Sequence, residues 1–90
     1  MRVRIHGRIP ERHPEISKHD VIVAWKNSFV VQERFGVELP NETLVALGTD
    51  PHGRVLEMTA VNLIDGTTLI YHAMTPPTKK VLEELGRWIP

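Results

Sequence analysis

The chain has 90 residues, of which 41% are hydrophobic and 24% are charged, and its lysines and arginines balance its aspartates and glutamates at 11 each. This composition excludes a disordered chain, which would combine low hydrophobicity with high net charge, and it indicates one small domain over residues 1–90. Because cysteine is absent, a disulfide framework and a thiolate metal site are excluded. The polar start and the lack of an apolar run of membrane-spanning length lead us to expect a cytoplasmic protein outside the membrane.

The first predicted element is a strand over residues 2–6. Val3 and Ile5 alternate there with basic side chains, at the period of two residues that is typical of a half-buried strand. Pro10 and Pro14 then predict irregular chain. The basic residues and histidines of this region form either a solvated basic end or a local patch for RNA. They are Arg2, Arg4, His6, Arg8, Arg12 and His13.

A helix is predicted to begin at Ser17. This serine stands three residues before Asp20, which is the spacing of a capping box. Apolar residues recur from Val21 to Phe29 at the spacing of one helix face, and this pattern places Trp25 and Phe29 in the core. Residues 30–42 have no sustained period and are expected to form a connecting loop or a frayed helix end.

Three strands joined by two turns are expected next. Residues 50–53 read DPHG, with proline second and glycine fourth, as suits a type I turn. Asp65 and Gly66 are the favoured pair for a two-residue type I′ hairpin loop. The result is a three-stranded antiparallel meander.

The two-residue loop also predicts the register of the second hairpin. It pairs Thr59 with His72 and places Glu57 diagonally across the ladder from His72. The other predicted pairs are Ile64 with Thr67, Asn62 with Leu69, Ala60 with Tyr71, and Met58 with Ala73. One face then receives the helices and comprises Leu56, Met58, Ala60, Leu69, Tyr71 and Ala73. The opposite face holds the polar groups and comprises Val55, Glu57, Thr59, Val61, Ile70, His72 and Met74.

The last predicted element is a helix capped by Thr75 or Thr78, because the two prolines between them are tolerated only before or within a first turn. Its inward stripe comprises Val81, Leu82, Leu85, Trp88 and Ile89. Lys79 and Lys80 fall near the helix start, where the macrodipole disfavours cations. They are either ordinary solvated lysines or contacts for a ligand. The predicted single core comprises Trp25, Phe29, Leu56, Met58, Tyr71, Val81 and Leu85.

The predicted order of strand, helix, three-stranded antiparallel meander and helix describes a small α+β domain. With these elements the chain resembles the BrnT-type toxins of bacterial type II toxin-antitoxin systems, which are small relatives of the RelE ribonucleases. The resemblance rests on Arg12-His13 before a helix, a strand ending in ALG, Gly53-Arg54 opening the next strand, and a last strand followed by a short turn and a basic helix. It implies a RelE-like fold, a metal-independent RNA endonuclease without a cofactor, and a cognate antitoxin protein as partner.

The last strand departs from the family, which carries arginines there in a motif like R-I-I-S-A-R. This chain reads LIYHAM, with Leu69 and Met74 at the arginine positions and His72 at the serine. A substitute set is therefore expected, in which His72 transfers protons and Glu57 orients the imidazole. The residues expected to contact phosphate or RNA are Arg54, Lys79, Lys80, Arg12 and His13.

Two alternatives to this assignment stay open. His72 can be a half-exposed strand residue matched to Thr59, and His13 can serve in structural hydrogen bonding. For the whole chain, the alternative to an endonuclease is a non-catalytic RelE-like binding module that kept the fold and lost the arginines. The five histidines show neither a helical pairing four residues apart nor an H-E-x-x-H motif, so no metal site is expected.

Overall fold

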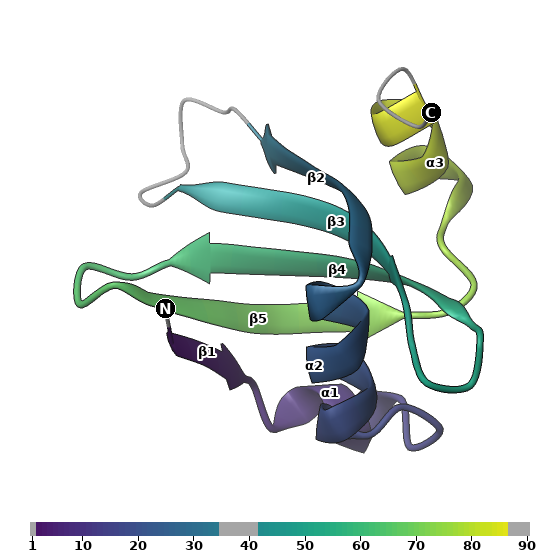
Figure 1. Ribbon diagram of the computed structural model, residues 1–90, viewed down its shortest axis with the longest axis horizontal. Helices are drawn as coiled ribbons and strands as arrows, with labels where there is room; N and C mark the ends of the chain where they lie inside the picture. The colour runs from purple at the N-terminus through teal and green to yellow at the C-terminus, as the bar shows by residue number, and fades with distance from the viewer. Residues whose placement is uncertain (1, 35–41, 87–90) are drawn as a thin grey trace.

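The computed structural model describes residues 2–34 and 42–86, and these residues form five strands and three helices. In chain order they are β1 (Arg2–Ile5), α1 (Arg8–Arg12), α2 (Lys18–Lys26), β2 (Ser28–Arg34), β3 (Thr43–Thr49), β4 (Val55–Asn62), β5 (Thr67–Met74) and α3 (Lys79–Leu85). The strands form one sheet in the order β1-β5-β4-β3-β2, as Figure 1 shows. Strand β1 runs parallel to β5, and the other neighbours are antiparallel. The predicted α+β class is confirmed, and the predicted meander forms the centre of a mixed sheet.

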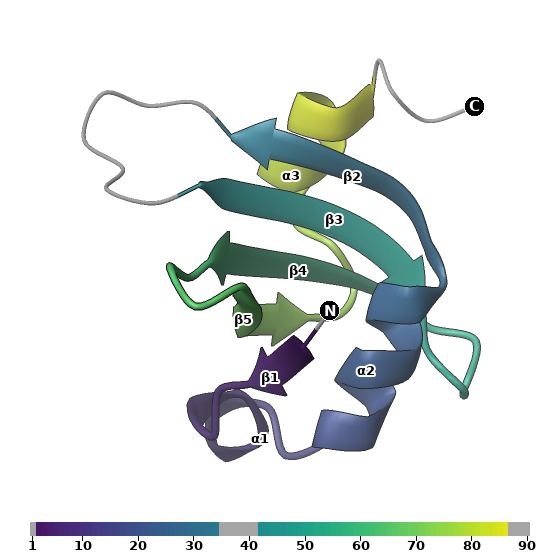
Figure 2. The ribbon, with the colours of Figure 1, turned by 60° about the vertical axis from the view of Figure 1, so that its left-hand side comes forward.

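Helices α2 and α3 lie on opposite faces of this sheet (Figure 2). Side chains alternate along β3, so Ala46 joins the buried cluster under α2 whereas Val45 and Leu47 join the cluster under α3. The prediction of a single core is therefore wrong. Leu56 and Met58 belong to the α2 cluster, while the predicted core residues of the last helix belong to the α3 cluster.

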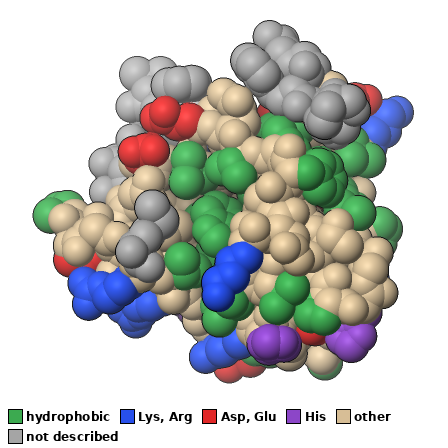
Figure 3. All heavy atoms as spheres, in the orientation of Figure 1, with side chains coloured by type: hydrophobic (Ala, Val, Ile, Leu, Met, Phe, Trp, Pro, Cys, Tyr) green, Lys and Arg blue, Asp and Glu red, His purple; other side chains and the backbone are tan. Residues whose placement is uncertain are grey.

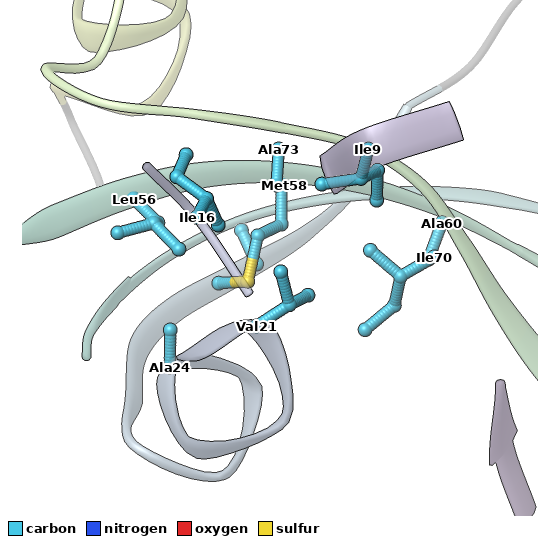
Figure 4. Packing of buried hydrophobic residues seen from close by; sticks show 10 residues of the cluster. Ile9, Ile16, Val21, Ala24, Leu56, Met58, Ala60, Ile70 and Ala73 are labelled. Atoms are coloured by element: carbon cyan, nitrogen blue, oxygen red, sulfur yellow. The ribbon is translucent and has the colours of Figure 1, made fainter. Parts of the chain in front are cut away.

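The α2 cluster is closely packed. Figure 4 shows Val21 and Ala24 of α2 directed toward Met58 of β4, and all three side chains are fully buried. Helix α2 also lies close to the backbone of β3, because a Cβ atom added at Gly48 would overlap the carbonyl oxygen of Ala24. This glycine thus permits the helix to reach the sheet.

The start of α2 confirms the predicted capping box, but its end differs from the prediction. Ser17 Oγ accepts a hydrogen bond from the Asp20 N–H, and the Asp20 carboxylate accepts one from the Ser17 N–H. The helix ends at Lys26, so Phe29 lies in β2 and is 43% exposed. Trp25 is half-buried against the α2 cluster.

Two elements were not predicted. Residues 30–34, expected as a loop or a frayed helix end, belong to β2, whereas residues 35–41 lie outside the described part of the chain. Strand β2 pairs with β3, and a long-range contact of this kind leaves no local period in the sequence. Helix α1 accommodates Pro10 at its third residue, within the first turn, where a missing N–H costs no helical hydrogen bond.

The second hairpin has a loop one residue longer than predicted. The Leu63 N–H donates to the Thr67 carbonyl oxygen, and the Gly66 N–H donates to the Leu63 carbonyl oxygen. The loop therefore comprises residues 64–66, with Gly66 at a φ of +86°. A turn followed by a left-handed glycine is the common three-residue alternative to the type I′ loop.

The longer loop moves the register near the turn, and a bulge then restores it. Ala60 pairs with Ile70 instead of Tyr71, so Ile70 lies in the α2 cluster and Leu69 pairs with Val61 on the opposite face. Tyr71 is the extra residue of a bulge. Beyond it the predicted pairs of Thr59 with His72 and of Met58 with Ala73 are confirmed.

Helix α3 is capped by Thr78, whose Oγ1 accepts a hydrogen bond from the Val81 N–H at 3.3 Å. Val81 and Leu85 are buried as predicted, whereas Leu82 is 43% exposed. The predicted inward positions of Trp88 and Ile89 lie outside the described residues.

One face of the molecule carries separated charged side chains. Figure 3 shows lysine and arginine side chains at several separate places on the face seen in Figure 1, with hydrophobic side chains across its middle. Over residues 2–34 and 42–86, no helix has the length and apolar character needed to cross a membrane.

Candidate functional site

A histidine and a carboxylate meet on the sheet face that carries α3. His72 Nε2 lies 2.9 Å from Glu57 Oε2, a contact that their predicted diagonal position allows. The other carboxylate oxygen, Glu57 Oε1, accepts a hydrogen bond of 2.6 Å from the backbone N–H of Thr78 at the start of α3. Glu57 is only 4% exposed, whereas the His72 side chain is 36% exposed. A buried carboxylate therefore holds an imidazole that solvent can reach.

The surroundings of Glu57 favour its charged form. Burial by itself raises the pKa of a carboxyl group, but hydrogen bonds from the Thr78 N–H and from His72 outweigh burial, and the pKa of Glu57 lies below its ordinary value of 4.5. A carboxylate only accepts hydrogen bonds, so in the neutral ring Nε2 carries the hydrogen and Nδ1 carries the free electron pair. Within the described residues, Nδ1 of His72 has no hydrogen-bond partner.

An open groove of about 310 Å³ lies beside this pair. Its lining comes from α1, β2, β4, β5 and α3, so residues far apart in the chain meet there. The lining residues are Arg8, Arg34, Glu57, Thr59, Tyr71, His72, Thr78, Lys80 and Val81.

The two arginines of this groove differ in how they are engaged. Arg8 Nε donates a 2.9 Å hydrogen bond to the Tyr71 carbonyl oxygen, and its guanidinium carbon lies 5.5 Å from the centre of the Tyr71 ring. The two Nη groups of Arg8 make no hydrogen bond to the described residues, so they are free to donate to a ligand. Arg34 instead forms a two-bond ion pair with Glu84 at 3.0 and 2.9 Å, which ties β2 to α3 and raises the pKa of Arg34.

A second, smaller hollow of about 90 Å³ adjoins the groove. Arg8, Tyr71 and His72 line both spaces, so these three residues stand between them. Arg12 and His13 line the smaller hollow only.

Five of the seven residues predicted for the site are thus brought together. They are His72 and Glu57 as the hydrogen-bonded pair, Lys80 in the groove, and Arg12 and His13 in the adjoining hollow. Lys79 lies outside both spaces. Its side chain is 90% exposed, and its Nζ atom is 3.9 Å from Glu83 Oε1.

Arg54 is engaged elsewhere, on the side of the sheet that carries α2. Its guanidinium pairs with Asp50 at 2.8 Å and with Asp20 at 3.3 Å, and it lines neither space. Backbone hydrogen bonding at Ser17 lowers the pKa of Asp20, with His52 and Arg54 adding to the effect. Burial raises the pKa of Asp50, but hydrogen bonds from Arg54 and His52 outweigh it and lower that pKa. Arg54 therefore stabilises the turn before β4 and the start of α2.

The sequence analysis gave no site role to Arg34 and Tyr71, and it named Arg8 only as part of the basic start. Arg8 and Arg12 stand four residues apart, which is the spacing of one helix face, but Pro10 argued against a helix there. Tyr71 was predicted in the core, but as the extra residue of the bulge it is half-buried and lines both spaces, and the bulge has no sequence signal. Arg34 could not be found without β2.

Comparisons with protein-family models, curated proteins and solved structures found no match to this chain. The interpretation of the site therefore depends on its geometry. In the part of the chain that the structure describes, no group of three or more histidine, aspartate or glutamate side chains is placed to hold a metal ion.

Proposed function

We propose that this chain is a metal-independent endoribonuclease with a RelE-like fold, and that it acts as the toxin of a type II toxin-antitoxin pair. The observation that carries the proposal is the His72-Glu57 pair in a groove that also holds Arg8 and Lys80. An imidazole can move a proton near neutral pH, and cationic side chains can hold a phosphate.

The proposed reaction is an attack of a ribose 2′-hydroxyl on the adjacent phosphorus. His72 Nδ1 takes the proton of the 2′-hydroxyl as a general base. The new bond joins the 2′ oxygen to phosphorus, and the bond from phosphorus to the 5′ oxygen breaks. The leaving 5′ oxygen takes a proton from solvent, and His72 later returns its own proton to solvent. The products are a 2′,3′-cyclic phosphate and a 5′-hydroxyl.

The neighbours of His72 have separate tasks in this reaction. The ionised Glu57 holds the ring through Nε2, which leaves Nδ1 as the base, and it stabilises the imidazolium that forms. The free Nη groups of Arg8 and the ammonium of Lys80 hold the phosphate as negative charge develops on its oxygens.

The test is cleavage of a labelled single-stranded RNA by purified wild type and by His72→Ala. Loss of a general base is expected to slow cleavage by about 10²–10⁴-fold. Circular dichroism checks that the variant is folded, and a chelator should leave the wild-type rate unchanged. Equal rates for the two proteins would remove His72 from the chemistry.

A second candidate function is a non-catalytic binding module of the same fold. It is favoured by Leu69 and Met74, which occupy the positions where the toxins carry arginines. If neither protein cleaves RNA while the wild type still binds a protein or RNA partner, this second function is supported instead.

The toxin proposal also requires a cognate antitoxin protein that blocks the groove. Co-expression with any small protein that is encoded beside this chain tests this requirement, and a cognate antitoxin should give a complex that survives purification and suppresses both growth inhibition and RNA cleavage. A chain that is harmless when induced alone and captures no partner contradicts this part of the proposal.

A further inference from the structure

The smaller hollow beside the groove is lined by cationic and imidazole side chains. Its two cations are Arg8 and Arg12, the imidazoles of His13 and His72 also line it, and no acidic side chain does. With about 90 Å³ it is far smaller than the 310 Å³ groove, so it suits a compact group. A compact anion, such as a phosphate, matches both its size and its charge.

Side chains that line this hollow keep hydrogen-bond donors that no described residue uses. Arg12 is exposed, and its side chain forms no ion pair or hydrogen bond with the described residues. Helix α1 places Arg8 and Arg12 one turn apart, on the same side of the helix. Among the described residues, the His13 ring has only a long contact of 3.5 Å to Glu15, while its backbone N–H donates to the Ile9 carbonyl oxygen and fixes the residue at the end of α1.

The position of Arg8 connects the hollow to the proposed reaction. Its Nε atom is fixed to the Tyr71 carbonyl oxygen, so the guanidinium stands between the two spaces with both Nη groups free. A nucleic acid strand that places one phosphate beside His72 in the groove can place a neighbouring phosphate in the hollow.

From this arrangement we infer that the smaller hollow is a second phosphate site, which binds the phosphate next to the one that is cleaved. The inference rests on the proposed ribonuclease function and specifies its substrate. The substrate is a single-stranded oligonucleotide with at least two successive phosphates. Arg12 is a binding residue of the second phosphate, and Arg8 contacts both.

The experiment measures binding without cleavage. The probe is a fluorescent 2′-O-methyl RNA hexamer, which lacks the attacking hydroxyl group, and its affinity is followed by anisotropy at several salt concentrations. For Arg12→Ala we expect about tenfold weaker binding, the effect of one charge-assisted hydrogen bond. The slope of log affinity against log salt should fall by about 0.7, the value for one phosphate contact to a single strand.

Lys79→Ala is the matched control, because it removes an exposed cation that lines neither space. It should leave the affinity and the slope close to those of the wild type. Equal affinity and slope for wild type and Arg12→Ala would overturn the second site. An equal loss in both variants would overturn it as well, since the effect would then be one of general charge.

The second site and the catalytic proposal can fail separately. A wild type that shows the expected Arg12 effect but cleaves no RNA retains the second site and loses the ribonuclease function. Conversely, if His72 is needed for cleavage but wild type and Arg12→Ala bind the hexamer equally well, the ribonuclease function is retained and the second site is lost. If the wild type does not bind the hexamer, the second site is overturned whatever the cleavage assay shows.

Discussion

Glu57 links the catalytic proposal to the position of α3. One of its oxygens contacts His72 Nε2, and the other accepts from the Thr78 N–H at the helix start. Because Glu57 is 4% exposed, water can replace neither contact at low cost. The carboxylate therefore orients the imidazole and fixes the first turn of α3 at once.

This double role predicts a catalytic loss without unfolding for Glu57→Gln. The amide oxygen can still accept from Thr78, so α3 should remain in place, but the amide nitrogen then faces His72 Nε2 and can only donate to it. The ring hydrogen then lies on Nδ1, the atom that acts as the base, and no carboxylate stabilises the imidazolium. We expect RNA cleavage slower than in the wild type, by up to the roughly 10²–10⁴-fold of His72→Ala. Single-turnover rates for the three proteins check this prediction. A Glu57→Gln rate equal to that of the wild type would leave Glu57 with a structural role only.

The two neighbouring lysines should behave differently, although the sequence analysis treated them as a pair. Lys80 lines the groove, whereas Lys79 is 90% exposed beside Glu83. Lys80→Ala is therefore expected to raise KM for RNA and to lower the salt slope by about 0.7, and Lys79→Ala should do neither. Steady-state kinetics at two salt concentrations compares them. Equal effects of the two substitutions would mean that the lysines act through general charge and not through the groove.

At the scale of elements, local sequence signals predicted the start of helix α2 better than its end. The capping box at Ser17 is complete within four residues, and it was predicted correctly. The end of α2 was not, because the apolar spacing continues through Phe29 although Asn27 ends the helix. Strand β2 depends on its pairing with β3. The sequence of β2 and of the segment that connects it to β3 has no hydrophobic period, so this strand could not be predicted.

The candidate site was only partly predictable for the same reason. The Glu57-His72 pair follows from the hairpin, and it survived an error in the loop because the bulge at Tyr71 restored the register. Arg8 and Arg34 come from the two elements that the sequence analysis missed. Five elements line the groove, so its residues can be predicted from the sequence only where those elements are themselves predicted.

The closeness of α2 and β3 predicts a large effect for Gly48→Ala. The added Cβ would overlap the Ala24 carbonyl oxygen, which is backbone and cannot turn aside as a side chain can. We expect a loss of about 1–3 kcal/mol or more in the free energy of unfolding, as for overpacked cores. Urea unfolding followed by tryptophan fluorescence measures it.

Gly7→Ala is the matched control for this substitution. Gly7 has a helical backbone, with φ −60° and ψ −23°, and open space where a Cβ would stand. Alanine there should leave stability unchanged or raise it by about 0.4–1 kcal/mol. Equal losses in the two variants would contradict the close approach of α2 to β3.

At the scale of the whole molecule, charge is balanced overall and concentrated locally. A net charge of +0 gives no overall field that attracts RNA. The arginines and the lysine that line the groove and the hollow come from α1, β2 and α3, so folding brings these cations together on a protein without net charge. Affinity for RNA should consequently depend on a few residues and not on the total charge.

The buried carboxylates set how the whole fold responds to acid. Hydrogen bonds lower the pKa values of Glu57, Asp20 and Asp50 below their ordinary values of 4.5 for glutamate and 3.8 for aspartate. A group with a lowered pKa in the folded state binds fewer protons there than in the unfolded chain. Its contribution to stability is therefore present above the ordinary pKa and is lost as the pH falls through the folded value.

This reasoning predicts that the free energy of unfolding falls as the pH is lowered from about 5 to about 3, and that Asp50→Asn weakens this dependence. Asp50 accepts from the N–H groups of His52 and Arg54 and from the Arg54 side chain, so the variant should lose about 1–3 kcal/mol near neutral pH. The difference from the wild type should shrink as the pH falls below the ordinary pKa, because the unfolded wild type then binds a proton that the folded state does not. Glu11→Gln, at an exposed carboxylate, is the control and should follow the wild-type curve. Urea unfolding across this pH range measures the free energy of unfolding of all three proteins. If the difference between Asp50→Asn and wild type stays constant as the pH falls, the charge of Asp50 is not what stabilises the turn.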